Sequence, residues 1–320
     1  MKVLYVFNSS LDRPSFMTYG YSYFMKSFSK KYDAYSIEKK TVFTRMRFRK
    51  MPDYYKAISY INTSNPDIVY ITSDGPAIEI LKLRSNIHVE VKIVVNAVGI
   101  TTSHLYGKEV FLQKSDAIIC FSHKIKNKLE TTKTKFIKYG TDFDYFKYKS
   151  DKKGYVVCIG NDLHRDWKLL DKIANFLPEI DFFIIGRDVN KLHLSSSNII
   201  SLGNTDFLET RDVLMSASLC LVLTKNNDAF SGETTILNSL ACGTNVLFPN
   251  DDNLIDHGEL QRYTYRRNID NATLADRVKK EINNTVSIGD YEKLKKIYHY
   301  DVFCKRLDGF FSTLESDISE

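Results

Sequence analysis

The sequence predicts an α/β protein made of two Rossmann-like domains with parallel sheets. Short apolar runs alternate with amphipathic segments along the chain, and alternation of strand and helix is typical of a parallel sheet. The alternation stops at a polar, charged segment, YKSDKKG at 148–154, and then starts again. The 320 residues are enough for two domains of ordinary size, and 43% of them are hydrophobic, as in proteins with a substantial core.

The first half of the chain supplies the first set of alternating elements. Each predicted strand is a compact apolar run such as KVLYVF or IVYIT, and each predicted helix carries apolar residues at helical spacing. The predicted strands are 2–7, 33–37, 68–72, 91–95, 117–121 and 135–138, and the predicted helices are 16–30, 77–83 and 123–129. We therefore expect residues 1–148 to form an N-terminal Rossmann-like domain.

The second half repeats this layout without a detectable sequence repeat. The predicted strands are 155–160, 181–186, 198–202, 219–223 and 245–248, and the predicted helices are 167–176, 207–216, 233–241, 273–283 and 290–314. Residues 149–295 are expected to form a C-terminal Rossmann-like domain. Residues 296–320 are expected to form a C-terminal helix that packs back on the N-terminal domain.

Composition and charge narrow the class of protein. The formal net charge of +6 is mild; it suits an anionic ligand or an anionic membrane surface and does not single out nucleic acid. The five cysteines are far apart and form no CxxC pair, which indicates reduced thiols in a cytoplasmic protein and argues against a zinc site. No apolar run reaches transmembrane length, and MKVLYVFNSS reads as a strand and a turn rather than a signal peptide.

The most basic segment is 39–55, KKTVFTRMRFRKMPDYY, in which aromatic residues are interleaved with lysines and arginines. It has three interpretations. One is the solvated face of a helix that buries its aromatic side chains. Another is a patch for anionic lipid or another acidic acceptor, and a patch for lipid would make the protein membrane-peripheral. An RNA-binding patch is a distant third.

The stretch NNDAFSGETTILNSLACGTNVLF, residues 226–248, carries the most chemical information. It predicts a loop, a helix over 233–241, a glycine stop and a strand. A helix start presents unpaired backbone N–H groups, so it can hold a phosphate. Gly232 would allow close approach, and Ser231, Thr234 and Thr235 would add hydroxyl donors. The alternative is an ordinary capped helix with Ser231 as its N-cap.

Several segments, in order, resemble the retaining GT-B glycosyltransferases of family 4. They are PDIVYITSD, SDAIICFSHKIKNKL, IKYGTDFDYF, CIGNDLHRDWKLL, DFFIIGRD, NIISLGNT and FSGETTILNSLACGTNVL. Together they span roughly residues 60 to 250. The resemblance implies a GT-B fold, in which two Rossmann-like domains have parallel sheets facing a central cleft.

The resemblance also implies a reaction and its partners. A sugar would pass from a nucleotide-diphosphate sugar, bound by the C-terminal domain, to a hydroxyl of a glycan or lipid-linked acceptor, with retention and without metal or cofactor. The expected catalytic residues are Arg165, Lys168 and Glu233. The expected donor-binding residues are Gly160, Asn161, His164, Ser231, Gly232, Thr234, Thr235 and Asn238. The expected acceptor-side residues are Asn8, Ser9, Ser10 and Asn96.

The chain departs from the family pattern at informative positions. Asn238 stands where the second glutamate of the family's donor segment is usual, and Asn161 stands where an arginine usually follows the loop glycine. Asp142 and Asp144 fit a DxD metal pattern, but they sit at a strand end, and we interpret them as structural. These departures keep open a non-catalytic GT-B-shell binding or scaffold protein and, more remotely, a nucleotide-sugar epimerase.

Overall fold

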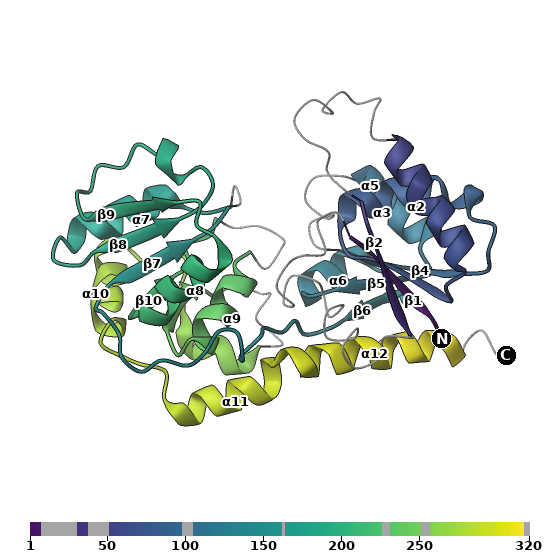
Figure 1. Cartoon of the computed structure of the whole chain (residues 1–320). Helices are drawn as coiled ribbons and strands as arrows, with labels where there is room; N and C mark the ends of the chain where they lie inside the picture. The colour runs from purple at the N-terminus through teal and green to yellow at the C-terminus, as the bar shows by residue number, and fades with distance from the viewer. Residues whose placement is uncertain are drawn as a thin grey trace. The chain divides into compact units, whose positions relative to one another are not determined.

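The computed structural model describes residues 1–7, 31–37, 51–97, 105–161, 164–225, 231–250 and 257–316. The chain forms two compact units (Figure 1). Unit 1 contains residues 1–139 and 300–320, and unit 2 contains residues 140–299. The domain boundary suggested by the sequence, at 148/149, therefore lies inside unit 2. The Lys152 ammonium group there donates to the carbonyl oxygens of Met215 and Cys242, so this polar segment is anchored to the unit.

The sheet of unit 1 has six strands in the order β2-β1-β3-β4-β5-β6. All of its pairings are parallel, as the alternation of elements predicts. The strands are β1 (Val3–Phe7), β2 (Tyr32–Ser36), β3 (Ile68–Ile71), β4 (Lys92–Asn96), β5 (Ala117–Cys120) and β6 (Thr134–Phe136). The first, third and fifth strands are buried at every position, which explains their unbroken apolar sequences.

Helices cover this sheet on opposite sides. They are α2 (Met51–Ser64), α3 (Asp74–Lys82), α5 (Leu105–Lys114), α6 (His123–Leu129) and α12 (Tyr300–Ser316), with a short 3₁₀ turn at Arg84–Asn86. In Figure 1, α2, α3 and α5 lie on the side of the sheet away from α12. The ring of Phe311 in α12 packs against those of Tyr5 and Tyr70, so α12 covers the central strands.

The sheet of unit 2 also has six strands, in the order β12-β11-β10-β7-β8-β9, and all pairings are parallel. The strands are β7 (Val156–Ile159), β8 (Phe182–Ile185), β9 (Ile199–Gly203), β10 (Leu219–Leu221), β11 (Asn245–Pro249) and β12 (Thr264–Tyr265). The five predicted strands are confirmed. The sequence analysis missed β12, a two-residue strand too short to show a period.

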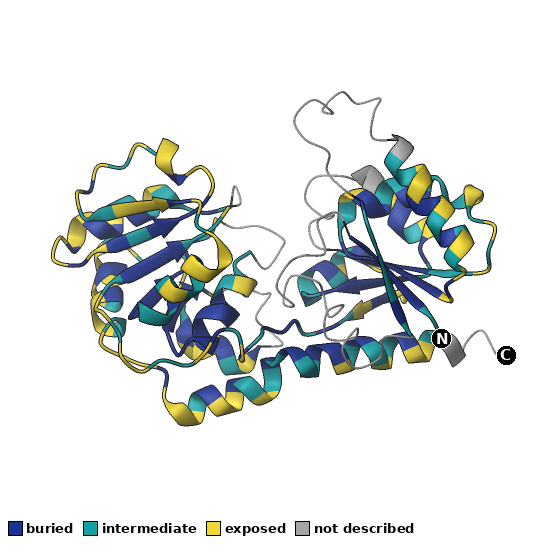
Figure 2. Cartoon of the chain, in the orientation of Figure 1, coloured by how far each residue is buried: buried dark blue, intermediate teal, exposed yellow. Residues whose placement is uncertain are grey.

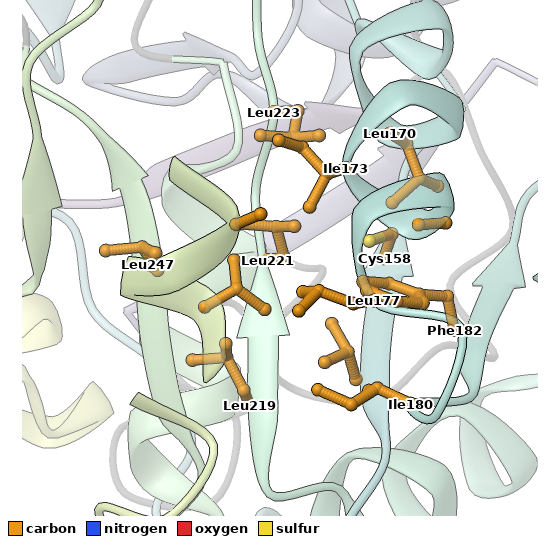
Figure 3. Packing of buried hydrophobic residues seen from close by; sticks show 14 of the residues in the cluster. Cys158, Leu170, Ile173, Leu177, Ile180, Phe182, Leu219, Leu221, Leu223 and Leu247 are labelled. Atoms are coloured by element: carbon orange, nitrogen blue, oxygen red, sulfur yellow. The ribbon is translucent and has the colours of Figure 1, made fainter. Parts of the chain in front are cut away.

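Helices of unit 2 are α7 (Trp167–Phe176), α8 (Phe207–Ser216), α9 (Glu233–Ala241), α10 (Asn271–Glu281) and α11 (Ile288–Tyr298), with 3₁₀ turns at Val189–Lys191 and Gly258–Tyr263. Figure 3 shows α7 leucine and isoleucine side chains facing Leu219, Leu221 and Leu223 of the β10 region. The strands form most of the buried interior of each unit, and most exposed positions lie on helices and turns, although β9 is exposed at three of its five positions (Figure 2).

One helix prediction needs correction. The segment 290–314 is not a single helix, because α11 ends at Tyr298 and α12 begins at Tyr300, with the His299 backbone extended between them at φ −57° and ψ 142°. The Thr141 amide donates to the Tyr298 carbonyl oxygen at 2.8 Å, and Thr141 forms a β-bridge with His299. This bridge joins the two ends of unit 2, which runs from Gly140 to His299.

Three predictions lie outside the described residues: the helix 16–30, the basic residues 39–50, and the candidates Asn8, Ser9 and Ser10. Within the described ranges, no helix combines the length and hydrophobicity required to cross a bilayer.

Candidate functional site

The strand order of unit 2 locates a place for a ligand. β7 lies between β10 and β8 in the sheet. After β7 the chain forms β8 and β9 on one side of it, and then returns to form β10, β11 and β12 on the other side. Loops that follow β7 and β10 therefore diverge at the same edge of the sheet. Open α/β sheets bind ligands at such a switch point, outside the carboxyl ends of the strands.

Backbone hydrogen bonds hold these two loops together. The Lys225 amide donates to the His164 carbonyl oxygen at 2.7 Å, and the Asp166 amide donates to the Leu223 carbonyl oxygen at 3.0 Å. Asp166 then begins α7, because its carboxylate accepts from the Leu169 amide at 3.0 Å. The loop after β7 is therefore fixed against the segment that follows β10.

Arg165 occupies the centre of this arrangement. Its side chain is buried, with 7% of the residue exposed, and its Nε donates to the Ile159 carbonyl oxygen at 2.9 Å. A Cβ atom placed on Gly160 would lie only 2.0 Å from this Nε, and one placed on Gly232 would lie 3.3 Å from Nη1 of the same side chain. The guanidinium group thus passes over one glycine and reaches the other, which brings three predicted site residues together.

A small pocket beside Arg165 has an apolar floor. Its lining includes Cys158, Leu170, Leu221 and Leu223. Burial raises the pKa of the Cys158 thiol well above its ordinary value, so this cysteine is neutral. The guanidinium group therefore lies beside a mostly apolar surface, to which Asp166 adds the one carboxylate of the pocket lining.

The start of α9 differs from the expected N-cap. The N-cap residue is Gly232 and not Ser231, and its φ of +99° lies in the left-handed region that favours glycine. A Cβ at this position would also lie 2.7 Å from Cγ1 of Val222. Because glycine has no side chain to accept a hydrogen bond, Gly232 makes no side-chain cap at the start of α9, a helix end of the kind that binds anions.

Glu233, the first residue of α9, is turned into the protein. It is 8% exposed, and its Oε1 lies 3.9 Å from Nε2 of His257, which is fully buried. Nδ1 of His257 lies 2.6 Å from the Tyr298 hydroxyl, and the two rings are stacked. The carboxylate predicted to be catalytic is thus the end of a buried acid–histidine–tyrosine chain, and its catalytic role stays a prediction.

Asn238 is also directed inward. It is 9% exposed, and its Oδ1 accepts a hydrogen bond from the Thr141 hydroxyl at 2.5 Å. The side chain expected to bind the donor ribose is therefore engaged with the segment that opens unit 2. The sequence placed Thr141 in a family-like turn but gave no signal that it would meet Asn238.

The remaining donor-side residues lie at the same edge with different exposure. The Asn161 Oδ1 accepts from the Arg187 amide at 2.6 Å, so this side chain organises the loop after β8. Lys168 is exposed in the first turn of α7, and Thr234 is exposed in the first turn of α9. Asn96 of unit 1 is fully buried, and its amide donates to the Thr72 carbonyl oxygen at 3.3 Å. Its acceptor-side role stays a prediction.

Arg267 is a residue that the sequence analysis missed. It follows β12, and its Nη1 donates to the Thr224 carbonyl oxygen at 2.6 Å. Thr224 is the β-bridge partner of Arg165, so two arginines contact the same segment. The only sequence signal was a basic pair at 266–267 after a strand too short to recognise.

The Asp142–Asp144 pair has structural contacts. The Asp142 carboxylate accepts from the amides of Asp144 and Tyr145, and Asp144 lies 3.3 Å from the Lys295 ammonium group and 3.4 Å from His299. In the described part of the chain, no three His, Cys, Asp or Glu side chains gather as they would around a metal ion.

Comparison with known proteins shows the fold. The sequence matches no protein-family model and no curated protein sequence. The structure resembles HepE from Anabaena in complex with UDP-glucose, with a TM-score of 0.74 and 11% identity over 98% of this chain and 100% of that one. It also resembles a sucrose-phosphate synthase from Thermosynechococcus elongatus, with a TM-score of 0.74 and 12% identity over 99% of this chain and 100% of that one.

A third similar structure is a candidate UDP-N-acetylglucosamine 2-epimerase from Listeria monocytogenes. It aligns with a TM-score of 0.64 and 12% identity, over 99% of this chain and 97% of that one. Sequence identities this low show a shared fold and do not show a shared reaction. The two six-stranded parallel sheets and the full-length structural matches show that this chain has the GT-B fold.

Proposed function

We propose that this protein is a glycosyltransferase that moves a sugar from a nucleotide-diphosphate donor to an acceptor hydroxyl with retention of configuration. The observation that carries the proposal is the position of Arg165. Its guanidinium group joins the loop after β7 to the start of α9 at the switch point of unit 2. Both elements are suited to bind phosphate groups.

The chemistry required is stabilisation of charge on a departing nucleoside diphosphate. Arg165 would neutralise a phosphate oxygen, and the first amides of α9 would donate to another. Lys168, exposed in the adjacent first turn of α7, is the second cation within the same loop–helix unit. A preorganised donor of this kind contributes roughly 3 kcal/mol to transition-state stabilisation.

Three similarities support a nucleotide sugar as the donor. Of the similar structures, one contains UDP-glucose, one is a sucrose-phosphate synthase and one is a candidate UDP-sugar epimerase. The segment FSGETTILNSLACGTNVL resembles the donor segment of retaining family 4 enzymes, and this resemblance supports retention. The acceptor class that fits the proposal is a glycan or lipid-linked hydroxyl.

A binding and transfer experiment tests the proposal. Thermal shift is measured with UDP-, GDP- and ADP-sugars, first for the wild type and then for Arg165→Ala. We expect one nucleotide series to raise the melting temperature and the variant to lose that rise. Transfer to an acceptor hydroxyl is then followed by NMR, which reports the anomeric configuration of the product. No shift with any nucleotide, or an inverted product, would contradict the proposal.

The contacts of Asn238 favour one second candidate, a GT-B protein that binds nucleotide without transferring sugar. Its amide stands where the family carries an acid and is occupied by the Thr141 hydroxyl. This candidate predicts a thermal shift that depends on Arg165, with neither hydrolysis nor transfer of the sugar in the same samples.

A further inference from the structure

Unit 1 contains a groove that the proposed donor chemistry does not use. It lies between β6, an edge strand of the sheet, and α12, and has a volume of about 510 Å³. Its lining residues are Lys135, Phe136, Ile137, Lys138, Arg306, Gly309, Phe310 and Thr313. Pockets of a few hundred cubic ångströms are large enough for a small amphiphile.

The walls of the groove are aromatic. Phe136 and Phe310 are both half-buried, one on the strand and one on the helix, and the ring of Phe136 lies 4.3 Å from that of His123. Gly309 keeps the space between them open. A Cβ atom at Gly309 would meet nothing within 4 Å, so the groove is not closed by packing at this position.

The charged lining residues are all cationic. Lys135, Lys138 and Arg306 contribute positive charge, and no acidic residue is among the lining residues. The Arg306 Nη1 donates to the Lys138 carbonyl oxygen at 3.2 Å, so the helix and the strand are joined along this edge. The neighbouring stretch 123–138, HKIKNKLETTKTKFIK, adds further lysines and a single acid, Glu130.

We propose that this groove, formed by β6 and α12, docks unit 1 on an anionic lipid bilayer. Phosphate headgroups would pair with Lys135, Lys138 and Arg306, and the rings of Phe136 and Phe310 would lie at the level where headgroups meet acyl chains. A purely acidic protein surface would use the cations but would leave the aromatic walls unmatched. The proposal is independent of sugar transfer and of the basic segment 39–55.

Gly309 offers a test that leaves the fold intact. Gly309→Glu puts a negative charge into the groove at a position with open space, and both glutamate and glutamine favour a helix more than glycine does. Gly309→Gln is the neutral variant of matched size. Gly289→Glu adds the same charge to a helix of unit 2, where a Cβ would meet only the Ser287 hydroxyl, at 3.9 Å.

The measurement is co-sedimentation of the full chain with phosphatidylcholine vesicles, with and without phosphatidylglycerol, at increasing salt. We expect binding only with phosphatidylglycerol, weaker at high salt, and about fivefold weaker in Gly309→Glu than in Gly309→Gln. The double variant Lys135→Gln/Arg306→Gln should bind about 25-fold more weakly than wild type, because each cation near an anionic bilayer contributes about fivefold. Gly289→Glu should match the wild type.

Three results would overturn the proposal. The first is a wild type that does not bind the anionic vesicles. The second is anionic-vesicle binding that is equal in Gly309→Glu, Gly309→Gln and the double variant, which would assign the membrane contact to another segment. Loss of binding to soluble polyglutamate in the double variant, with vesicle binding intact, would identify an acidic protein partner and would also contradict the proposal.

Discussion

The substitution Gly160→Ala tests the central geometry of the proposed donor site with a single methyl group. The added Cβ would lie 2.0 Å from Nε of Arg165, 2.5 Å from its Cγ and 2.7 Å from its Cδ. Atoms cannot approach this closely, so the arginine side chain must leave its place. The hydrogen bond from Nε to the Ile159 carbonyl oxygen, at 2.9 Å, would be lost with it.

The effect on ligand affinity follows from that displacement. A hydrogen bond to a charged group contributes about 1.5–3 kcal/mol, which corresponds to roughly a 10- to 150-fold change in a dissociation constant. We expect Gly160→Ala to weaken nucleotide-sugar binding by this amount although the variant retains Arg165. The fold should survive, because the obstructing atoms belong to a long side chain that can move; overpacking costs about 1–3 kcal/mol.

Isothermal titration calorimetry with the nucleotide sugar that gives the largest thermal shift measures this effect. Gly258→Ala is the matched control, because a Cβ at Gly258 would meet nothing within 4 Å in the same unit. Gly160→Ala should approach the affinity of Arg165→Ala, and Gly258→Ala should bind as the wild type does. Unchanged affinity in Gly160→Ala, alongside a loss in Arg165→Ala, would refute the assigned path of the side chain.

Three further predictions concern the stability of unit 2. Lys152→Met should lower the free energy of unfolding by about 2 kcal/mol, measured with urea, because the ammonium group donates to the Met215 and Cys242 carbonyl oxygens and to the Thr244 hydroxyl. The control is Lys153→Met, at an exposed neighbouring position, and an equal effect of this variant would contradict the prediction. Thr141→Val should reduce stability toward thermal unfolding by about 1–2 kcal/mol, because the buried Asn238 oxygen loses its hydrogen-bond donor. Thr141→Ser keeps the hydroxyl and should retain most of the wild-type stability, a result that a purely steric role of Thr141 would not give. Burial by itself raises the pKa of Asp171, but hydrogen bonds from the backbone amides and hydroxyls of Ser195 and Ser196 hold this pKa at about 2. Because the pKa is depressed in the folded protein, the ionised carboxylate stabilises the fold above about pH 4, and this stabilisation is lost as the pH falls toward 2. Asp171→Asn should therefore reduce stability at pH 7 by about 1 kcal/mol at most, since the half-buried carboxylate is still screened by solvent, and the difference from wild type should disappear in unfolding curves near pH 2.

The sequence predicted the central strands well because each is a short apolar run that is almost completely buried. Val3–Phe7 and Ile68–Ile71 are buried at every position, and no residue elsewhere in the chain is needed to recognise them. The helices over 167–176, 207–216 and 233–241 were also predicted with the observed bounds, since polar residues mark their starts and apolar spacing marks their inner faces.

The site was predicted less well because its geometry depends on contacts between distant residues. Asn238 meets Thr141, which lies 97 positions away, and Glu233 meets His257 from a different loop. Ser231 fits the residue preferences of an N-cap, yet the backbone places Gly232 there with a positive φ, a feature that residue preference alone does not reveal. Arg165 was predictable as a loop cation, but its passage over Gly160 was not.

The bridge between Thr141 and the Tyr298–His299 segment makes unit 2 an insertion in the chain of unit 1. Residues 140–299 form one continuous segment whose two ends are hydrogen-bonded to each other, while unit 1 is made from the chain on either side of it. Domains with adjacent ends are the ones that tolerate excision and transplantation. Unit 2 can therefore be produced as a single uninterrupted fragment, and a short Gly/Ser connection from Tyr139 to Tyr300 would close the chain of unit 1 in its absence.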